Sequence, residues 1–297
     1  MNAFYRMGIR YEKRQMAKHD AKRDAGLTIS DGVEICDNVS YGPHGEANLL
    51  CVYRPKDTKG KLPCIVNFHG GGYFYGNKEL YQYYSAGLAE RGFVVVTFNY
   101  RMVPEHRFPA PLQDANRVMK WIERKGDWYG IDVNNVFLVG DSAGAQLVNH
   151  YATIMTNPEF AANFKFEVPT GVKVRAVAMN CGLYDVLNLK DFPMRFMMMA
   201  YARGAFRKKS NRLDVVGNMT SDFPPSYVAT ATHDFLRSHA KPLEELLRKL
   251  GVDCVYKLYG EENDLQAEHV FHVNMKSEIG KQCNDDECAF FKKYVGA

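Results

Sequence analysis

Apolar residues along the chain follow two different spacings. Short continuous apolar runs, typical of strands buried on both faces of a sheet, occur for example at residues 62–68 and 92–101. Residues 112–125 instead place apolar side chains at i, i+3 and i+4, the spacing of an amphipathic helix. Strands that alternate with helices predict a mainly parallel, doubly wound α/β sheet. The predicted strands are residues 29–39, 47–53, 62–68, 92–101, 136–139, 174–181, 226–232 and 254–259.

Two segments stand outside this alternation. Residues 3–25 place apolar side chains among basic ones and predict one or two amphipathic helices before the sheet begins. A Met-rich, aromatic stretch within residues 185–222 interrupts the order of strands and helices. The first two strands, joined by a turn at residues 41–45, are expected to pair antiparallel. No linker-like composition divides the chain, so a single domain is expected over residues 1–297.

The segment at residues 135–147, NVFLVGDSAGAQL, carries the first candidate chemistry. An apolar strand ends there in the pattern G-x-S-x-G, centred on Ser142, and a helix-favouring segment follows. Glycines on both sides leave room for a sharp turn, and the start of the helix directs free N–H groups to the place where an oxyanion would form. The pattern predicts that Ser142 is a catalytic nucleophile.

A second glycine-rich segment, HGGGY at residues 69–73, ends an earlier buried strand. Three consecutive glycines allow the backbone to approach a ligand closely and to present bare N–H groups. Because ordering such a segment is entropically costly, a tight loop with a purpose is favoured over a flexible turn. For His69 we expect a structural role, in which its ring holds the glycine loop by hydrogen bonds.

A serine hydroxyl needs a histidine base at neutral pH, and the imidazolium that forms needs a carboxylate beside it. In this architecture the chain order is serine, acid, histidine. Asp234 follows the predicted strand at residues 226–232, and His269 lies on the loop after the strand at residues 254–259. We therefore predict a triad of Ser142, His269 and Asp234.

Other residues of the same types remain open as alternatives. His272, three positions after His269, would be the base if the loop had another register, whereas His233 is expected to be a loop residue. Asp222 and Asp253 are alternative acids, although neither follows a clear strand end.

Composition and charge narrow the class of protein. The chain of 297 residues is 46% hydrophobic and 24% charged, which is ordinary for a globular protein. Its net charge of +4 comes from short basic clusters interrupted by acids, so nucleic-acid binding is not expected. The seven cysteines are scattered and lack the spacing of a zinc site. They are expected to be reduced core residues of a protein in a reducing compartment. No apolar stretch resembles a signal peptide or a membrane span, so a soluble, cytoplasmic protein is expected.

Taken together, the motifs resemble those of the hormone-sensitive-lipase-like carboxylesterases, a branch of the α/β-hydrolases. The resemblance extends in the family's order and spacing over roughly residues 62–271. It rests on HGGG at residues 69–72, YRMVPEHRFPA at residues 100–110, GDSAG at residues 140–144, DFLR at residues 234–237 and HVF at residues 269–271.

This resemblance implies an α/β-hydrolase fold with an eight-stranded, mainly parallel sheet and a helical cap built from about residues 1–25 and 185–222. It also implies Ser142 as nucleophile, His269 as base and Asp234 as the acid that orients the base. The oxyanion hole is implied to consist of the N–H groups of three residues, Gly71, Gly72 and Ala143. Two departures leave the subgroup open, namely Ser238 where members usually carry a second acid, and the acidic loop at residues 260–268.

The expected function is the hydrolysis of small carboxylic esters, acetyl to about hexanoyl, through an acyl-enzyme, with no metal and no cofactor. Candidates for substrate contact are Tyr73, Met197 and Phe206, although the Met-rich stretch could equally be the core of the cap. An amidase or peptidase with the same triad, or a non-catalytic receptor on this fold, are the alternatives. The expected partner is a small-molecule ester, with neither nucleic acid nor a membrane, and a homodimer is an allowed state.

Overall fold

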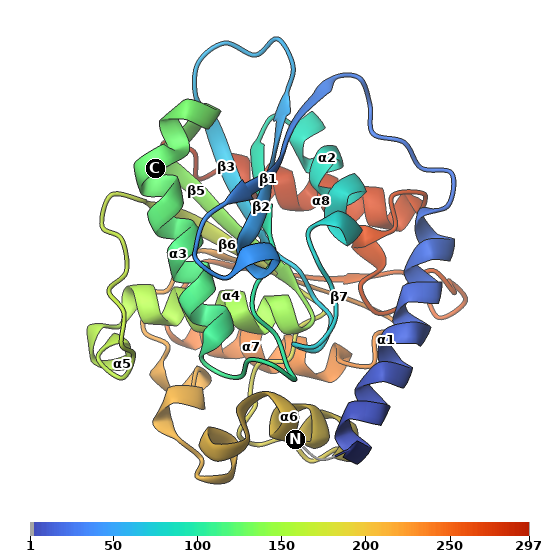
Figure 1. Ribbon diagram of the computed structural model, residues 1–297, viewed down its shortest axis with the longest axis vertical. Helices are drawn as coiled ribbons and strands as arrows, with labels where there is room; N and C mark the ends of the chain where they lie inside the picture. The colour runs from blue at the N-terminus through green and yellow to red at the C-terminus, as the bar shows by residue number, and fades with distance from the viewer. Residues whose placement is uncertain (1–2, 297) are drawn as a thin grey trace.

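A computed structural model describes residues 3–296, and its centre is one sheet of eight strands in the order β1-β2-β4-β3-β5-β6-β7-β8 (Figure 1). The pairs β1/β2 and β2/β4 are antiparallel, and all other neighbouring strands are parallel. The predicted eight-stranded, mainly parallel sheet and its antiparallel start are thus confirmed. The strands are β1 (Val33–Ser40), β2 (Leu49–Pro55), β3 (Leu62–Phe68), β4 (Val94–Phe98), β5 (Ile131–Asp141), β6 (Val174–Asn180), β7 (Ser226–Ala231) and β8 (Cys254–Tyr259).

Helices cover both faces of this sheet, because successive residues of a strand point to opposite sides. Val66 and Leu138 are buried in the core shared with α3, α4 and α7, whereas Ile65 and Phe137 are buried in the core shared with α2 and α8. The helices are α1 (Ala3–Asp24), α2 (Gln82–Glu90), α3 (Ala110–Lys125), α4 (Ala143–Thr156), α5 (Pro158–Ala161), α6 (Phe192–Arg207), α7 (Arg237–Lys249) and α8 (Glu278–Lys292).

Several elements agree closely with the sequence, and one helix was missed. β3 and β8 have the predicted bounds. Helix α2 was not predicted, because its run from Tyr84 to Ala89 is buried throughout and shows no polar face that would reveal a helical period. Helix α6 occupies much of the Met-rich stretch and lies at the lower end of the molecule in Figure 1.

Helix α1 is a single helix that runs along one side of the molecule (Figure 1). Over residues 7–24 of this helix, the buried and half-buried side chains form one narrow stripe, which consists of Ile9, Lys13, Met16, Asp20, Arg23 and Asp24. The last turns are tied to the body of the protein, since Tyr75 Oη donates to Asp20 Oδ2 at 2.6 Å and Arg23 donates to the carbonyl of Leu80 at 3.1 Å. The helix is thus anchored close to the glycine-rich segment.

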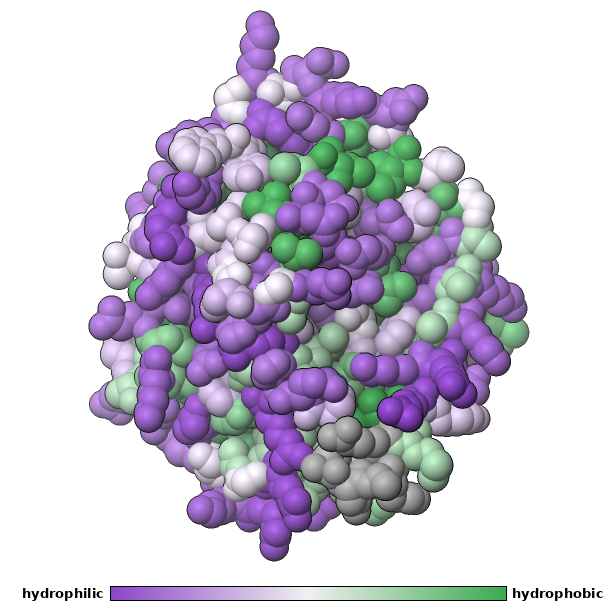
Figure 2. Space-filling view, viewed as in Figure 1, coloured by the Kyte–Doolittle hydropathy of each residue, from purple (hydrophilic) through white to green (hydrophobic). Residues whose placement is uncertain are grey.

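The face shown in Figure 2 is mainly hydrophilic, with hydrophobic side chains in small groups. Among the described residues, no helix combines the length and the apolarity that crossing a membrane requires.

Candidate active site

Ser142 occupies a sharp turn between β5 and α4, with φ 52° and ψ −117°. A residue with a side chain adopts positive φ only when its surroundings impose it. Here the neighbouring glycines are required by space, because a Cβ added to Gly144 would lie 1.9 Å from the carbonyl oxygen of Phe68, and one added to Gly140 would lie 2.5 Å from the carbonyl carbon of Gly144. The packed turn holds the serine at the carboxyl end of the sheet, where parallel strands gather their loops.

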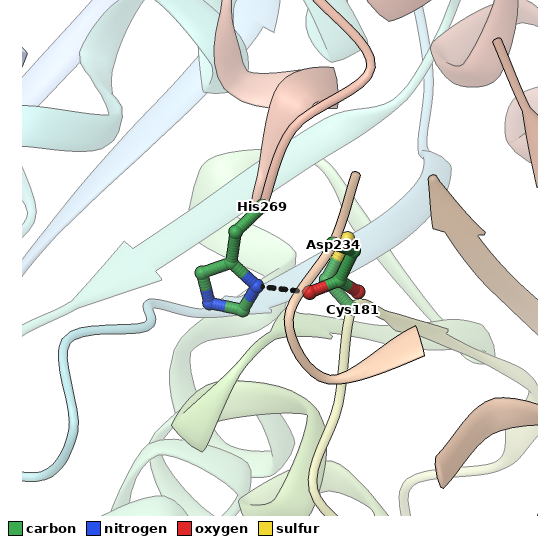
Figure 3. A group of neighbouring side chains, drawn as sticks. All are labelled: Cys181, Asp234 and His269. Atoms are coloured by element: carbon green, nitrogen blue, oxygen red, sulfur yellow. Dashed lines mark hydrogen bonds and ion pairs between the residues drawn. The ribbon is translucent and has the colours of Figure 1, made fainter. Parts of the chain in front are cut away.

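The structure brings together three residues that the sequence predicted on separate loops. His269 Nε2 lies 3.0 Å from Ser142 Oγ, and His269 Nδ1 lies 2.6 Å from Asp234 Oδ1. Figure 3 shows the second of these contacts. Because a carboxylate can only accept, Nδ1 carries the ring proton and Nε2 is left to accept the serine proton. The predicted nucleophile, base and acid therefore form one continuous hydrogen-bonded chain.

The carboxylate of Asp234 is buried yet well satisfied. Burial by itself would raise its pKa, but the hydrogen bond and charge of His269 lower that pKa, helped by the N–H of Leu236 and the hydroxyl of Thr230. Those two donors lie 2.9 Å from Oδ1 and 2.8 Å from Oδ2 respectively. The net pKa is below the ordinary value, so Asp234 is ionised at neutral pH and can stabilise an imidazolium.

The alternative bases and acids lie elsewhere. His272 is buried against Tyr84, with ring centroids 5.4 Å apart, and burial lowers the pKa of its imidazole to about 3. His233 is partnered by the carbonyl of Glu262. Asp222 is exposed, and Asp253 accepts a hydrogen bond from Tyr294. None of these four candidates has a hydrogen bond to Ser142 among the contacts of the described residues.

The glycine-rich segment after β3 forms a tight loop. Gly71 and Gly72 have φ of +108° and +60°, and a Cβ on Gly71 would lie 2.2 Å from the carbonyl oxygen of Tyr75. His69 Nδ1 donates to the carbonyl of Gly70 at 2.8 Å, which agrees with the structural role expected for this ring. Burial lowers the pKa of His69 to about 4, so the ring is neutral. Tyr100 stacks on it with centroids 4.1 Å apart.

The three candidate substrate contacts differ in their placement. Tyr73 is fully buried, stacks on Tyr201 and donates to Gln146, so it is placed in the core rather than on a pocket surface. Phe206 is also in the core cluster. Met197 lies near the glycine loop, because a Cβ on Gly72 would be 3.3 Å from its Sδ.

Two further residues adjoin the triad without having been singled out from the sequence. Phe235, although 64% exposed, packs on the imidazole of His269 with ring centroids 4.1 Å apart. Cys181, the residue after β6, is buried next to Asp234 (Figure 3). Burial and the neighbouring carboxylate raise the pKa of its thiol well above the ordinary value, so it is a neutral thiol. From the sequence, Cys181 could not be distinguished from any other core cysteine.

Cys181, Asp234 and His269 offer atoms within 4.8 Å of one another, which is also a spacing that metal ligands can have. However, His269 Nδ1 and Asp234 Oδ1 are only 2.6 Å apart. Two ligand atoms on one zinc ion lie more than about 3 Å apart, because each bond is about 2.0–2.3 Å long. The short separation is that of a charge-assisted hydrogen bond.

The chain is similar to known hydrolases over most of its length. Residues 65–272 match a family model described as "alpha/beta hydrolase fold". The chain is 30% identical over 209 residues to the probable carboxylic ester hydrolase LipM of Mycobacterium tuberculosis, an alignment that covers 67% of this chain and 48% of LipM. It is 25% identical over 234 residues to the acetyl esterase of Salmonella schwarzengrund, covering 73% of this chain and 68% of that enzyme.

The architecture also matches solved structures. Esterase B from Lactobacillus rhamnosis superposes with a TM-score of 0.90 at 24% identity, covering 99% of this chain and 96% of that one. The chain spans about half the length of the first two curated relatives it matches, 48% in each case. The family match over residues 65–272, together with the fold, shows that the chain belongs to the α/β-hydrolase family, as its motifs indicated.

Proposed function

We propose that this protein is a serine hydrolase of carboxylic esters. The observation that carries the proposal is the hydrogen-bonded chain from Ser142 Oγ through His269 to Asp234, at 3.0 Å and 2.6 Å, on a strained strand-to-helix turn. It is supported by the names of two relatives, a probable carboxylic ester hydrolase and an acetyl esterase.

The proposed reaction has two halves. Ser142 Oγ attacks the ester carbonyl while His269 Nε2 takes its proton, and His269 then returns that proton to the leaving alkoxide. Water hydrolyses the resulting acyl-enzyme, with His269 again as base. Asp234 remains ionised throughout and stabilises the imidazolium. The route uses side chains, backbone and water alone.

The backbone N–H groups of Gly71, Gly72 and Ala143 are proposed to bind the oxyanion. In the described part of the chain, the N–H groups of Gly71 and Gly72 donate no hydrogen bond to another residue, so they are available to a ligand. Ala143 is the first residue of α4, so its N–H group lies at the positive end of that helix. Each such donor contributes about 3 kcal/mol of transition-state stabilisation in comparable sites.

We further propose that residues 1–25 and 185–222 act as a cap and that short acyl groups are preferred. The cap is supported by contacts of both segments beside the site. Asp20 of helix α1 accepts a hydrogen bond from Tyr75, two residues after the glycine loop, and Met197 of α6 lies next to Gly72. A small, dispersed ester is the proposed partner, without nucleic acid or a membrane; a homodimer remains allowed, and the compartment proposed is the cytoplasm.

The test compares the wild-type chain with Ser142→Ala on p-nitrophenyl acetate, butyrate, hexanoate and decanoate. We expect Ser142→Ala to lose at least about 10³-fold in kcat, as removal of a covalent nucleophile does. Ser238→Ala, which removes another serine close to Asp234 in the sequence, serves as the matched control and should keep wild-type rates. A phosphonate ester should add its mass to Ser142 in the wild type alone. A Ser142→Ala protein with more than about a tenth of wild-type turnover would reject the mechanism.

A p-nitroanilide of the same acyl group distinguishes the alternative function. Faster hydrolysis of the anilide than of the ester would assign an amidase or peptidase. Wild-type protein that turns over neither substrate and binds no phosphonate would favour a non-catalytic receptor on this fold.

A further inference from the structure

One buried hydroxyl connects the two parts of the site that must act on the same carbonyl group. Tyr81 ends the short 3₁₀ turn at Glu79–Tyr81 and is 7% exposed. Its Oη accepts the N–H of Gly70 at 2.9 Å and donates to Asp141 Oδ2 at 2.8 Å. Gly70 precedes the two glycines of the proposed oxyanion hole, and Asp141 precedes the nucleophile Ser142.

These two segments come from adjacent strands. The glycine loop follows β3 and the nucleophile turn follows β5, and the strands end in register, with Phe68 opposite Gly140. Beyond that pair the sheet no longer holds the backbones together. The hydroxyl of Tyr81 continues the connection beyond this last pair, two residues after Phe68 on one segment and one residue after Gly140 on the other.

The contact between the segments is tight as well as polar. A Cβ added to Gly70 would lie 2.2 Å from Asp141 Oδ2. Asp141 is 1% exposed, and its second oxygen, Oδ1, has no hydrogen-bond partner among the described residues. The bond from Tyr81 is therefore the side-chain hydrogen bond that holds this carboxyl. Burial raises the pKa of Asp141 to about 7, and the hydroxyl of Tyr81 opposes that rise by favouring the ionised form.

Both ends of Gly70 are held by side chains. Tyr81 Oη accepts its N–H, and His69 Nδ1 donates to its carbonyl at 2.8 Å. That carbonyl and the N–H of Gly71 belong to one planar peptide unit, so fixing the carbonyl fixes the direction of the N–H. The direction of the Gly71 N–H is thereby set relative to Asp141, and through the backbone to Ser142.

We propose that Tyr81 is a positioning residue, whose hydroxyl ties the glycine loop to the nucleophile turn so that the Gly71 N–H is pre-aligned on the oxyanion that Ser142 generates. The inference rests on the proposed ester hydrolysis and adds a residue that touches neither substrate nor reacting atoms. Alignment matters because an oxyanion donor stabilises the transition state only if it is already directed at the developing charge.

The hydroxyl can be removed without removing the residue's packing. The ring of Tyr81 lies 5.9 Å from that of His69 and 6.3 Å from that of Tyr84, and Phe would keep both contacts. The adjacent backbone is held independently, since Arg23 of α1 donates to the carbonyl of Leu80 at 3.1 Å. Tyr81→Phe is therefore expected to fold.

The matched control is Tyr84→Phe, three residues further along. Tyr84 is also buried, and its Oη also donates to a buried acid, Glu287 Oε1, at 3.1 Å. Among the hydrogen bonds of residues 3–296, none joins Tyr84 to the glycine loop or to Asp141. Both variants remove one buried hydroxyl that faces a carboxyl group, so a general effect of that loss on the fold should be similar in the two.

The experiment measures kcat and KM on p-nitrophenyl butyrate, the inhibition constant of a trifluoromethyl ketone, which forms an oxyanion on the serine, and the melting temperature. For Tyr81→Phe we expect kcat to fall about tenfold with KM within about twofold, and ketone affinity to fall by the same factor as kcat/KM. Tyr84→Phe should keep kcat and ketone affinity within about twofold of the wild type.

Three outcomes would overturn the inference. Tyr81→Phe with kcat within about twofold of an active wild type would reject the positioning role while leaving the proposed function intact. Equal losses of kcat in Tyr81→Phe and Tyr84→Phe, with equal falls in melting temperature, would assign the effect to the fold. A wild type that hydrolyses no ester and does not differ from Ser142→Ala would remove the proposed function, and this inference with it.

Discussion

Replacement of Asp234 by Asn should slow ester hydrolysis without disturbing the proton on His269. Oδ1 of Asp234 accepts two N–H groups, from His269 and from Leu236, whereas Oδ2 accepts the hydroxyl of Thr230. An amide nitrogen at the Oδ1 position would face two donors. The amide oxygen of the introduced side chain should therefore take that position, with the nitrogen toward Thr230, whose hydroxyl can turn and accept. His269 then keeps its Nδ1 proton and its free Nε2.

The expected fall in kcat comes from the loss of the negative charge of Asp234, because the tautomer of His269 is kept. The Coulomb attraction between a carboxylate and an imidazolium about 4 Å apart is about 4 kcal/mol at an effective dielectric constant of 20. The neutral hydrogen bond that remains offsets about 1 kcal/mol of this. The net cost of about 3 kcal/mol corresponds to a fall in kcat of roughly 10²-fold to 10³-fold. In serine proteases, the same substitution with the wrong tautomer costs about 10⁴-fold.

Steady-state kinetics on p-nitrophenyl acetate at pH 8 distinguish the loss of charge alone from a loss that also changes the tautomer of His269. Asp222→Asn, an exposed residue that the sequence alone offered as another triad acid, is the control and should keep wild-type kcat. A loss of 10⁴-fold or more in Asp234→Asn would show that the amide turns the other way. A loss below about tenfold would show that Asp234 is not the acid of the triad.

Three further predictions concern the base, the cap and a buried acid. His269→Ala should abolish turnover, whereas His272→Ala should lower the melting temperature and leave most of kcat. The reverse pattern in kinetics and thermal melts would assign the base to His272. Deletion of residues 1–25 should lower kcat/KM and change the relative rates on acetate, butyrate and hexanoate esters, and unchanged relative rates would assign α1 a bracing role only. Burial raises the pKa of the Glu287 carboxyl from 4.5 to about 7, so its protonated form stabilises the fold at low pH and this contribution is lost as pH rises between those two values. Urea unfolding should therefore show Glu287→Gln gaining about 2–3 kcal/mol relative to the wild type between pH 5 and pH 8, and a pH-independent difference would contradict the buried charge.

The sequence alone predicted those features that depend on interactions between residues close together in the chain. The glycines around Ser142 predict the turn because no side chain fits there. In the structure, a Cβ added to Gly144 would lie only 1.9 Å from a carbonyl oxygen. The strands β3 and β8 were predicted with their observed bounds, since a continuous apolar run between turn residues has few other uses. The choice of Asp234 and His269 also followed from the predicted strands that precede them, because the loops after parallel strands gather at the same edge of the sheet.

Tertiary structure decided what depends on contacts between distant segments. Whether His269 or His272 faces Ser142 is set by the path of a loop, and two histidines three positions apart look alike in a sequence. Tyr73 follows the glycines and suggested a substrate contact, yet it is fully buried against Tyr201. The contacts of Tyr81 with Gly70 and Asp141 join residues 11 and 60 positions apart, and such pairings arise from the packing of strands and carry no pattern that hydrophobic periodicity could reveal.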